Sequence, residues 1–132
     1  MIVLDASAAV DALLYRSPHS DLIHEHLREH VGDLHAPHLL DAEVGEVLRR
    51  HVLRGALHPG AARDALGVLG GLRITRYAHL LFLPRALTLG DNLTVYDALY
   101  VALAEGLEAP LLTRDAGIAR SAGRLVEVVH IR

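Results

Sequence analysis

Short apolar runs alternate along the chain with longer segments in which apolar side chains recur every three or four residues. The first pattern is typical of buried parallel strands and the second of amphipathic helices. Strands are predicted at residues 2–4, 34–36, 72–75, 110–113 and 125–129, and helices near 10–14, 18–31, 38–54, 59–69, 79–89, 95–103 and 115–121. Because helices separate the strands, the pattern predicts an α/β fold whose parallel sheet is covered on both faces.

Polar and helix-breaking residues set the expected ends of these helices. We expect Ser7 to cap the first helix and the Ser17–Pro18 pair to begin the second. Thr94 is expected to cap the long helix that follows it, and Pro84 to interrupt the helix at 79–89 near its start. No repeat, low-complexity segment or linker divides the chain, so residues 1–132 are expected to form a single domain.

The amino-acid composition excludes several kinds of functional site. Hydrophobic residues make up 52% of the chain and charged residues 22%, which is enough apolar material for a packed core. Cysteine is absent, which excludes disulfides, zinc–cysteine sites, iron–sulfur clusters and thiol nucleophiles. No basic region precedes Asp5, and no run of about 18 apolar residues occurs, so we expect a cytoplasmic protein with no membrane contact.

The charge balance limits how the protein could meet a nucleic acid. All 13 basic residues are arginine, and they face 16 acidic residues, which gives a formal net charge of −3. This balance excludes a basic arm, a lysine-rich tail or a strongly cationic domain. One phenylalanine and four tyrosines also argue against a base-stacking platform. An enzyme that meets a polyanion through bound metal stays compatible with the sequence.

Four carboxylates occur where the surrounding residues predict burial. Asp5 follows the first predicted strand and Asp115 the fourth, whereas Glu43 and Asp97 lie in early turns of otherwise apolar helices. Ligands of parallel sheets bind at the carboxyl ends of strands, so one pocket at that edge could collect all four side chains. Each carboxylate taken alone is also explained as a helix cap or a surface charge.

Such a cluster has a chemical consequence. Like charges close together repel, and a divalent cation relieves the repulsion by accepting the carboxylate oxygens. Hard oxygen ligands in a protein without cysteine favour Mg²⁺ or Mn²⁺ over zinc. An ion of this kind orients a phosphate, activates water and stabilises a developing oxyanion. The cluster therefore predicts metal-dependent hydrolysis of a phosphodiester bond.

Four motifs occur in order along the chain: MIVLDASA at residues 1–8, PHLLDAEV at 37–44, LTVYDALYVALAE at 93–105 and PLLTRD at 110–115. Together they resemble PIN-domain proteins of the VapC toxin type, essentially from end to end. The resemblance implies a three-layer α/β/α sandwich and a toxin that is an RNA-cutting endoribonuclease dependent on Mg²⁺, with Mn²⁺ as an alternative. It also implies a homodimer and a cognate VapB-type antitoxin that neutralises the toxin.

The resemblance also implies roles for single residues. Asp5 and Asp97 would be the main metal ligands. Glu43 and Asp115 would complete the catalytic site, either by holding metal through water or by positioning the nucleophile.

Three other positions belong to the same motifs. Ser7 and Thr113 would support the acidic residues with their hydroxyl groups. The family often has asparagine one turn after the helix glutamate, and here that position is Glu46. Glu46 could add a fifth charge or face solvent, and we favour solvent.

The remaining candidates have plainer explanations. His24, His26 and His30 cluster on one predicted helix, where a solvated or dimer-facing surface is favoured over a zinc pair. Two further histidines, His35 and His38, could approach substrate. A solvated helix face is favoured for Arg49, Arg50 and Arg54, although they could bind phosphate or antitoxin carboxylates. Asp11, Asp41 and Asp91 are expected to be helix caps or surface charges.

Two other functional classes stay open. The first is another metal-dependent phosphoesterase; a phosphatase of the haloacid dehalogenase type would need a second aspartate where Ser7 stands. A catalytically silent interaction protein on a PIN scaffold would be expected to have lost an acid, and all four are present.

Removing the four carboxylates from the net charge of −3 leaves +1. We therefore expect RNA affinity to depend on divalent metal.

Overall fold

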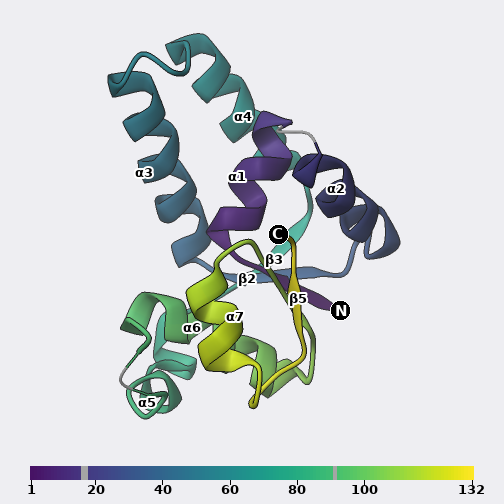
Figure 1. The fold of residues 1–132 in the computed structure, drawn as a ribbon, viewed down its shortest axis with the longest axis vertical. Helices are drawn as coiled ribbons and strands as arrows, with labels where there is room; N and C mark the ends of the chain where they lie inside the picture. The colour runs from purple at the N-terminus through teal and green to yellow at the C-terminus, as the bar shows by residue number, and fades with distance from the viewer. Residues whose placement is uncertain (16–17, 91) are drawn as a thin grey trace.

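A computed structural model describes residues 1–15, 18–90 and 92–132, and a five-stranded parallel sheet lies at its centre (Figure 1). The strands are β1 (Ile2–Leu4), β2 (Leu34–Pro37), β3 (Ile74–Tyr77), β4 (Leu111–Thr113) and β5 (Val128–His130). They are arranged in the order β3-β2-β1-β4-β5, and every neighbouring pair is parallel. The α/β class predicted from the apolar pattern is confirmed.

Helices cover both faces of the sheet. On one side lie α1 (Ala6–Leu14), α2 (His19–Glu29), α3 (Leu39–Leu53) and α4 (Pro59–Gly71) (Figure 1). On the other side lie the 3₁₀ turn η1 (His79–Leu81), α5 (Leu83–Ala86) and α6 (Val95–Leu107), while α7 (Ala116–Ala122) packs against β4 and β5. None of the helices in the described part of the chain is long and apolar enough to cross a membrane.

The core is made of the apolar runs themselves. All side chains of β1 and β4 are fully buried, as expected for central strands covered on both faces. Residues 98–104 of α6 are buried in an unbroken run, because this helix packs against β1, β2 and β4 together. Burial of this size is the main source of stability for the domain.

The order of the strands reverses at β1. The chain adds β2 and β3 on one side of β1 and then crosses to add β4 and β5 on the other. In open α/β sheets, ligands bind outside the carboxyl ends of the strands at such a reversal. The name crevice refers below to this edge of the sheet. Asp5 directly follows β1, and Asp115 lies two residues beyond β4. The topology therefore brings these two carboxylates to the same crevice.

Two predicted helix features are wrong in detail. Asp5, and not Ser7, caps α1, because the carboxylate directly after β1 accepts a hydrogen bond from the Ala8 N–H. The helix predicted at 79–89 is instead two short pieces, η1 and α5, with Pro84 in the first turn of the second.

Two strands begin later than predicted. β3 starts at Ile74 because Leu72 caps α4 and Arg73 takes a positive φ of 54°. β5 starts at Val128 because the preceding residues form a turn against the end of α7. The predictions for Ser17 and Asp91 fall outside the described residues.

Candidate active site

Asp5 directly follows β1 and is buried, with 2% of its surface exposed. Its Oδ1 accepts hydrogen bonds from Ser7 Oγ at 2.7 Å and from the Ala8 N–H at 3.0 Å, and its Oδ2 accepts one from the Thr113 hydroxyl. Burial, and to a smaller extent the charge of Asp115, raise the pKa of Asp5 to about 6 despite these three donors. The buried carboxylate is thus hydrogen-bonded but has no cation beside it.

The two hydroxyl groups connect β1 to β4 at this point. Ser7 Oγ and Thr113 Oγ1 lie 3.4 Å apart. Thr113 Oγ1 accepts the Asp115 N–H at 2.9 Å, and Ser7 Oγ accepts the Arg114 N–H, also at 2.9 Å. The hydroxyls therefore hold Asp5 and the backbone before Asp115 in one arrangement, as their predicted supporting role requires.

Asp115 is exposed at the mouth of the crevice, so its predicted burial is wrong. It caps α7, because its Oδ1 accepts the Ile118 N–H at 2.9 Å. A Cβ at Gly117 would lie 3.0 Å from the same oxygen, so glycine at this position leaves room for the carboxylate. The local fold fixes where Asp115 stands while leaving its second oxygen open to solvent.

Asp97 and Glu43 approach the crevice from two helices. Asp97 lies in the first turn of α6, and its N–H is capped by Thr94 Oγ1 at 3.1 Å, as predicted. Burial raises the pKa of Asp97, and the charge of Asp115 raises it further. Glu43 on α3 also has a raised pKa, first because it is half-buried and then because Asp97 is close. Mutual repulsion thus links all four carboxylates.

No arginine in the described part of the chain forms an ion pair with these four carboxylates. Arginines that do form ion pairs bind other acidic residues: Arg76 with Asp41, Arg85 with Glu105 and Arg114 with Asp11. Buried charges are normally paired, so the buried Asp5 and the half-buried Glu43 and Asp97, which are unpaired, cost stability. This pattern separates the crevice from the structural ion pairs of the molecule.

The four carboxylates are ligands of the chemical type that a hard divalent cation prefers. Every candidate ligand is a carboxylate oxygen, which Mg²⁺ and Mn²⁺ prefer. Among residues 1–15, 18–90 and 92–132, however, no three acidic or histidine side chains converge closely enough to hold one ion between them. Mg²⁺ keeps several waters and needs only one or two carboxylates, so the residues fit that mode of binding.

Sequence reasoning missed Tyr100. This tyrosine is fully buried on α6, and its O–H donates a 2.6 Å hydrogen bond to Glu43 Oε1. Burial and the Glu43 carboxylate raise the pKa of Tyr100, so the hydroxyl keeps its proton and acts as a donor. The available signal was its spacing: Tyr100 follows Asp97 by three residues and lies on the same face of the helix.

Several other candidates have structural roles. Asp11 is buried and bonded to Arg114, so its predicted surface role is wrong. Asp41 forms a bidentate pair with Arg76, which fits a surface charge. Glu46 is exposed, as favoured from the sequence.

The histidines also have local partners. Buried His35 lies between Asp33 and the Tyr77 hydroxyl, at 2.8 Å from each, so both ring nitrogens are already engaged. His24 and His30 hydrogen-bond to the backbone oxygens of Ala12 and His26. The described residues therefore give no support for a zinc pair on α2.

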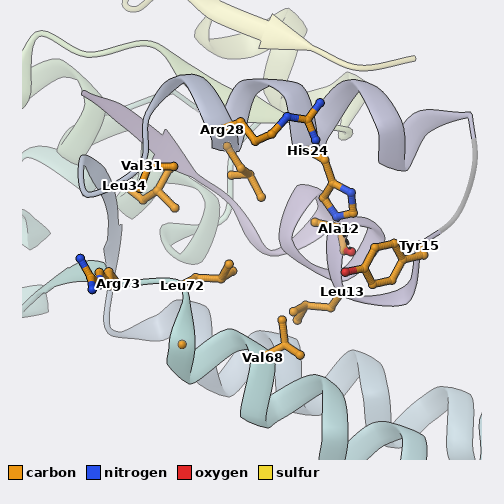
Figure 2. Close-up of a pocket in the computed structure, with 12 residues that line it drawn as sticks. Ala12, Leu13, Tyr15, His24, Arg28, Val31, Leu34, Val68, Leu72 and Arg73 are labelled. Carbon is orange, nitrogen blue, oxygen red and sulfur yellow. Dashed lines mark hydrogen bonds between the residues drawn. The ribbon is translucent and has the colours of Figure 1, made fainter.

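An apolar groove lies at the other end of α1 from Asp5. Figure 2 shows side chains of α1 and α2 facing Val68 of α4 across it. The groove has a volume of about 510 Å³. Tyr15 and Val31 at its border are 70% and 74% exposed. Arg28 and Arg73 add positive charge to the lining (Figure 2). Because α1 connects the two features, the groove and the crevice lie at opposite ends of one helix.

Comparison with known proteins decides the family. The PIN domain family model matches residues 2–124. The chain belongs to the PIN domain family. Ribonuclease VapC1 of Mycobacterium tuberculosis is 43% identical to this PIN domain over 134 aligned residues, which cover 98% of the chain and 97% of that protein. The resemblance to the VapC group drawn from the four motifs is confirmed.

The fold of the PIN domain is shared with more distant proteins. The crystal structure of PAE2754 from Pyrobaculum aerophilum superimposes with a TM-score of 0.72 at 23% identity, covering 96% of this chain and 89% of that one. VapBC2 from Rickettsia felis, bound to a DNA fragment from its promoter, gives a TM-score of 0.67 at 14% identity over the whole of both chains. At these identities the likeness shows the fold alone.

Proposed function

We propose that this PIN domain is a toxin of a type II toxin–antitoxin system that hydrolyses RNA phosphodiester bonds with the help of Mg²⁺ or Mn²⁺. The observation that carries the proposal is the crevice at the ends of β1 and β4, where like charge links four carboxylates. None of the four forms an ion pair with an arginine of the described chain. By contrast, Asp41, Glu105 and Asp11 each pair with an arginine. The ribonuclease name of the 43% identical relative supports the same activity.

Asp5 and Asp97 are the residues proposed to hold the cation. Their raised pKa values reflect burial and like charge, and a divalent ion would relieve both. When bound, the ion supplies electrostatic stabilisation of the negative charge that develops on the phosphate. Hydrogen bonds from Ser7 and Thr113 keep Asp5 fixed, so that little reorganisation is needed on binding.

Glu43 and Asp115 are proposed to orient the attacking water. The Tyr100 hydroxyl donates a hydrogen bond to Glu43 Oε1, which leaves Oε2 as the atom that can accept a proton from water. The raised pKa of Glu43 suits this role, since a base works best with a pKa close to the working pH. Asp115 stands at the exposed mouth, where a phosphodiester would enter.

The VapB-type antitoxin partner is proposed to neutralise the toxin by docking on the apolar groove. Structural neighbours that are complexes of the VapBC type support such a partner. The exposed apolar border of the groove and its two arginines suit an amphipathic segment that carries acidic residues. Changing Val68 in the groove to glutamate is expected to weaken capture of the toxin by co-expressed antitoxin; unchanged capture would contradict this placement.

The homodimer is proposed to form through the region between η1 and the start of α6. This region exposes a group of large apolar side chains, comprising Leu80, Leu81, Leu87, Val95 and Tyr96. Exposed apolar patches mark association surfaces. We expect light scattering to give a dimer for the wild type and a monomer for Leu81→Glu, and a dimeric variant would contradict the assignment.

RNA cleavage tests the proposed function directly. Purified protein is incubated with defined single-stranded and structured RNAs in Mg²⁺, Mn²⁺ or EDTA, and the ends of the products are mapped. Cleavage in either metal and none in EDTA is the expected result. Equal cleavage in EDTA would overturn metal dependence, and intact RNA under all conditions would overturn the ribonuclease assignment.

A further inference from the structure

A basic hollow lies beside the carboxylate crevice, between α7 and the end of β5. It has a volume of about 430 Å³ and is lined by Ala116, Ala119, Arg120, His130 and Arg132. Its size falls within the range of about 300–1,000 Å³ that is common for small-ligand sites. The name α7–β5 hollow refers below to these five residues.

All three ionisable side chains that line the α7–β5 hollow are basic. Arg120 is exposed and His130 is half-buried, and neither takes part in an ion pair within the described part of the chain. By contrast, the guanidinium groups of Arg76, Arg85 and Arg114 are each neutralised by a carboxylate. The hollow therefore keeps donors and positive charge available for an anion.

The position of the hollow ties it to the acidic site. Ala116, one of its wall residues, immediately follows Asp115. On the other wall, His130 is the partner of Thr113 in the register of β4 and β5, and Thr113 donates a hydrogen bond to Asp5. The α7–β5 hollow is thus one strand away from the buried carboxylate, at the same edge of the sheet.

A polyanion that approaches the crevice meets repulsion from four carboxylates. Cations at the scissile phosphate offset this repulsion locally, but the phosphates on either side need positive charge of their own. Arg120 can offer two parallel N–H donors to phosphate oxygens, and His130 can offer one. We propose that the α7–β5 hollow binds an RNA phosphate that flanks the scissile bond. This inference rests on the proposed ribonuclease function, because it takes RNA as the ligand.

RNA affinity of single variants tests the inference. Binding of a fluorescein-labelled single-stranded RNA is followed by anisotropy in EDTA, from about 50 to 200 mM salt, and the RNA is checked on a gel afterwards. We expect Arg120→Ala to weaken binding about tenfold and to reduce the slope of log affinity against log salt by about 0.7, as for the loss of one phosphate contact. Arg120→Lys should recover part of the affinity, since it restores the charge but not the paired donors.

The matched control is Arg63→Ala. Arg63 is also exposed, but it lies on α4, which packs against α1 and α3. Both variants remove one positive charge, so a loss caused by net charge alone would be the same in the two proteins. Wild-type affinity and salt slope in Arg120→Ala, or an equal loss in Arg63→Ala, would overturn the inference. Circular dichroism confirms that each variant is folded.

Two further outcomes separate this inference from the proposed function. If the wild type binds RNA, Arg120→Ala does not, and neither protein cleaves it with added metal, the phosphate site stands and the ribonuclease assignment fails. If the wild type cleaves RNA and Arg120→Ala shows the same KM, the assignment stands and the phosphate site fails. Weaker antitoxin capture by Arg120→Ala with unchanged RNA affinity would also overturn the inference, because the hollow would then bind protein.

Discussion

At the carboxyl end of β1, Asp5 is buried with no cation beside it, and its pKa is raised to about 6. At the amino end of the neighbouring β2, Asp33 is exposed to solvent on one side and bonded to the N-terminal amine and to His35 on the other. These two partners lower the pKa of Asp33. The pKa of an aspartate is therefore raised at the end of β1 and lowered at the start of the neighbouring strand β2.

The contrast between Asp5 and Asp33 shows which charged groups stabilise the fold. Asp33, Asp41 and Asp11 each contact a basic group, and such pairs hold elements together at modest cost. At the crevice, burial and like charge act together and nothing of opposite sign compensates them. Groups that destabilise the protein in this way are concentrated at functional sites. The comparison therefore supports the proposed catalytic role of the crevice and a structural role for the ion pairs.

The largest expected effect is the loss of RNA cleavage when one of the unpaired carboxylates in the crevice loses its charge. Asp97→Asn should reduce RNA cleavage by about 10²–10³-fold or more, because it removes a proposed ligand of the cation. Rates are measured under single-turnover conditions in Mg²⁺, and the far-ultraviolet circular dichroism should be unchanged. Cleavage at the wild-type rate would place the active site elsewhere.

A smaller effect is expected from the group that holds Glu43. Tyr100→Phe keeps the ring in the core but removes the donor to Glu43 Oε1, so kcat should fall about tenfold with little change in KM. The hydrogen bond also contributes about 1 kcal/mol to the free energy of unfolding. Ala98→Ser, a change on the same buried helix, serves as the control for disturbed packing alone. An unchanged kcat in Tyr100→Phe would show that Glu43 needs no positioning.

The pH dependence of stability distinguishes Asp5 from the paired acids. The pKa of Asp5 is raised in the folded state, so the folded protein binds more protons than the unfolded chain between pH 3.8 and about 6. Its stability should therefore fall as the pH rises through this window, by about 3 kcal/mol if Asp5 acts alone.

Urea unfolding in EDTA at several pH values measures this effect. The free-energy difference between Asp5→Asn and the wild type should grow in favour of the variant as the pH rises from 4 to 6.5, a range set by the pKa shift of Asp5. A difference that stays constant with pH would contradict the raised pKa. Asp33 acts in the opposite sense: its lowered pKa gives stability that is present above pH 3.8 and is lost in stronger acid.

The smallest effect is expected at a paired carboxylate. Asp41→Asn breaks the bidentate pair with Arg76 and should lower the free energy of unfolding by about 0.5–1 kcal/mol. RNA cleavage should remain at the wild-type rate, although Asp41 is only two residues from Glu43. A large loss of cleavage in Asp41→Asn would remove the distinction between paired and unpaired acids.

Sequence patterns predicted the sheet, its helical cover and the edge of the sheet at which Asp5 and Asp115 follow neighbouring strands. These features follow from local periodicity and from the fact that parallel strands end at one edge. Two contacts could not be predicted. Tyr100 meets Glu43 from 57 residues away, and Arg114 meets Asp11 from 103 residues away. Such contacts depend on how each helix is rotated about its axis, which the apolar pattern fixes only to within a face.

Binding of Mn²⁺ to the metal-free protein tests the central claim most directly. Free Mn²⁺ is followed by electron paramagnetic resonance during titration of the wild type, Asp97→Asn and Asp41→Asn. We predict saturable binding by the wild type and by Asp41→Asn, and its loss in Asp97→Asn. Equal binding by all three proteins, or no binding by the wild type, would contradict the assignment of the unpaired carboxylates to a divalent cation.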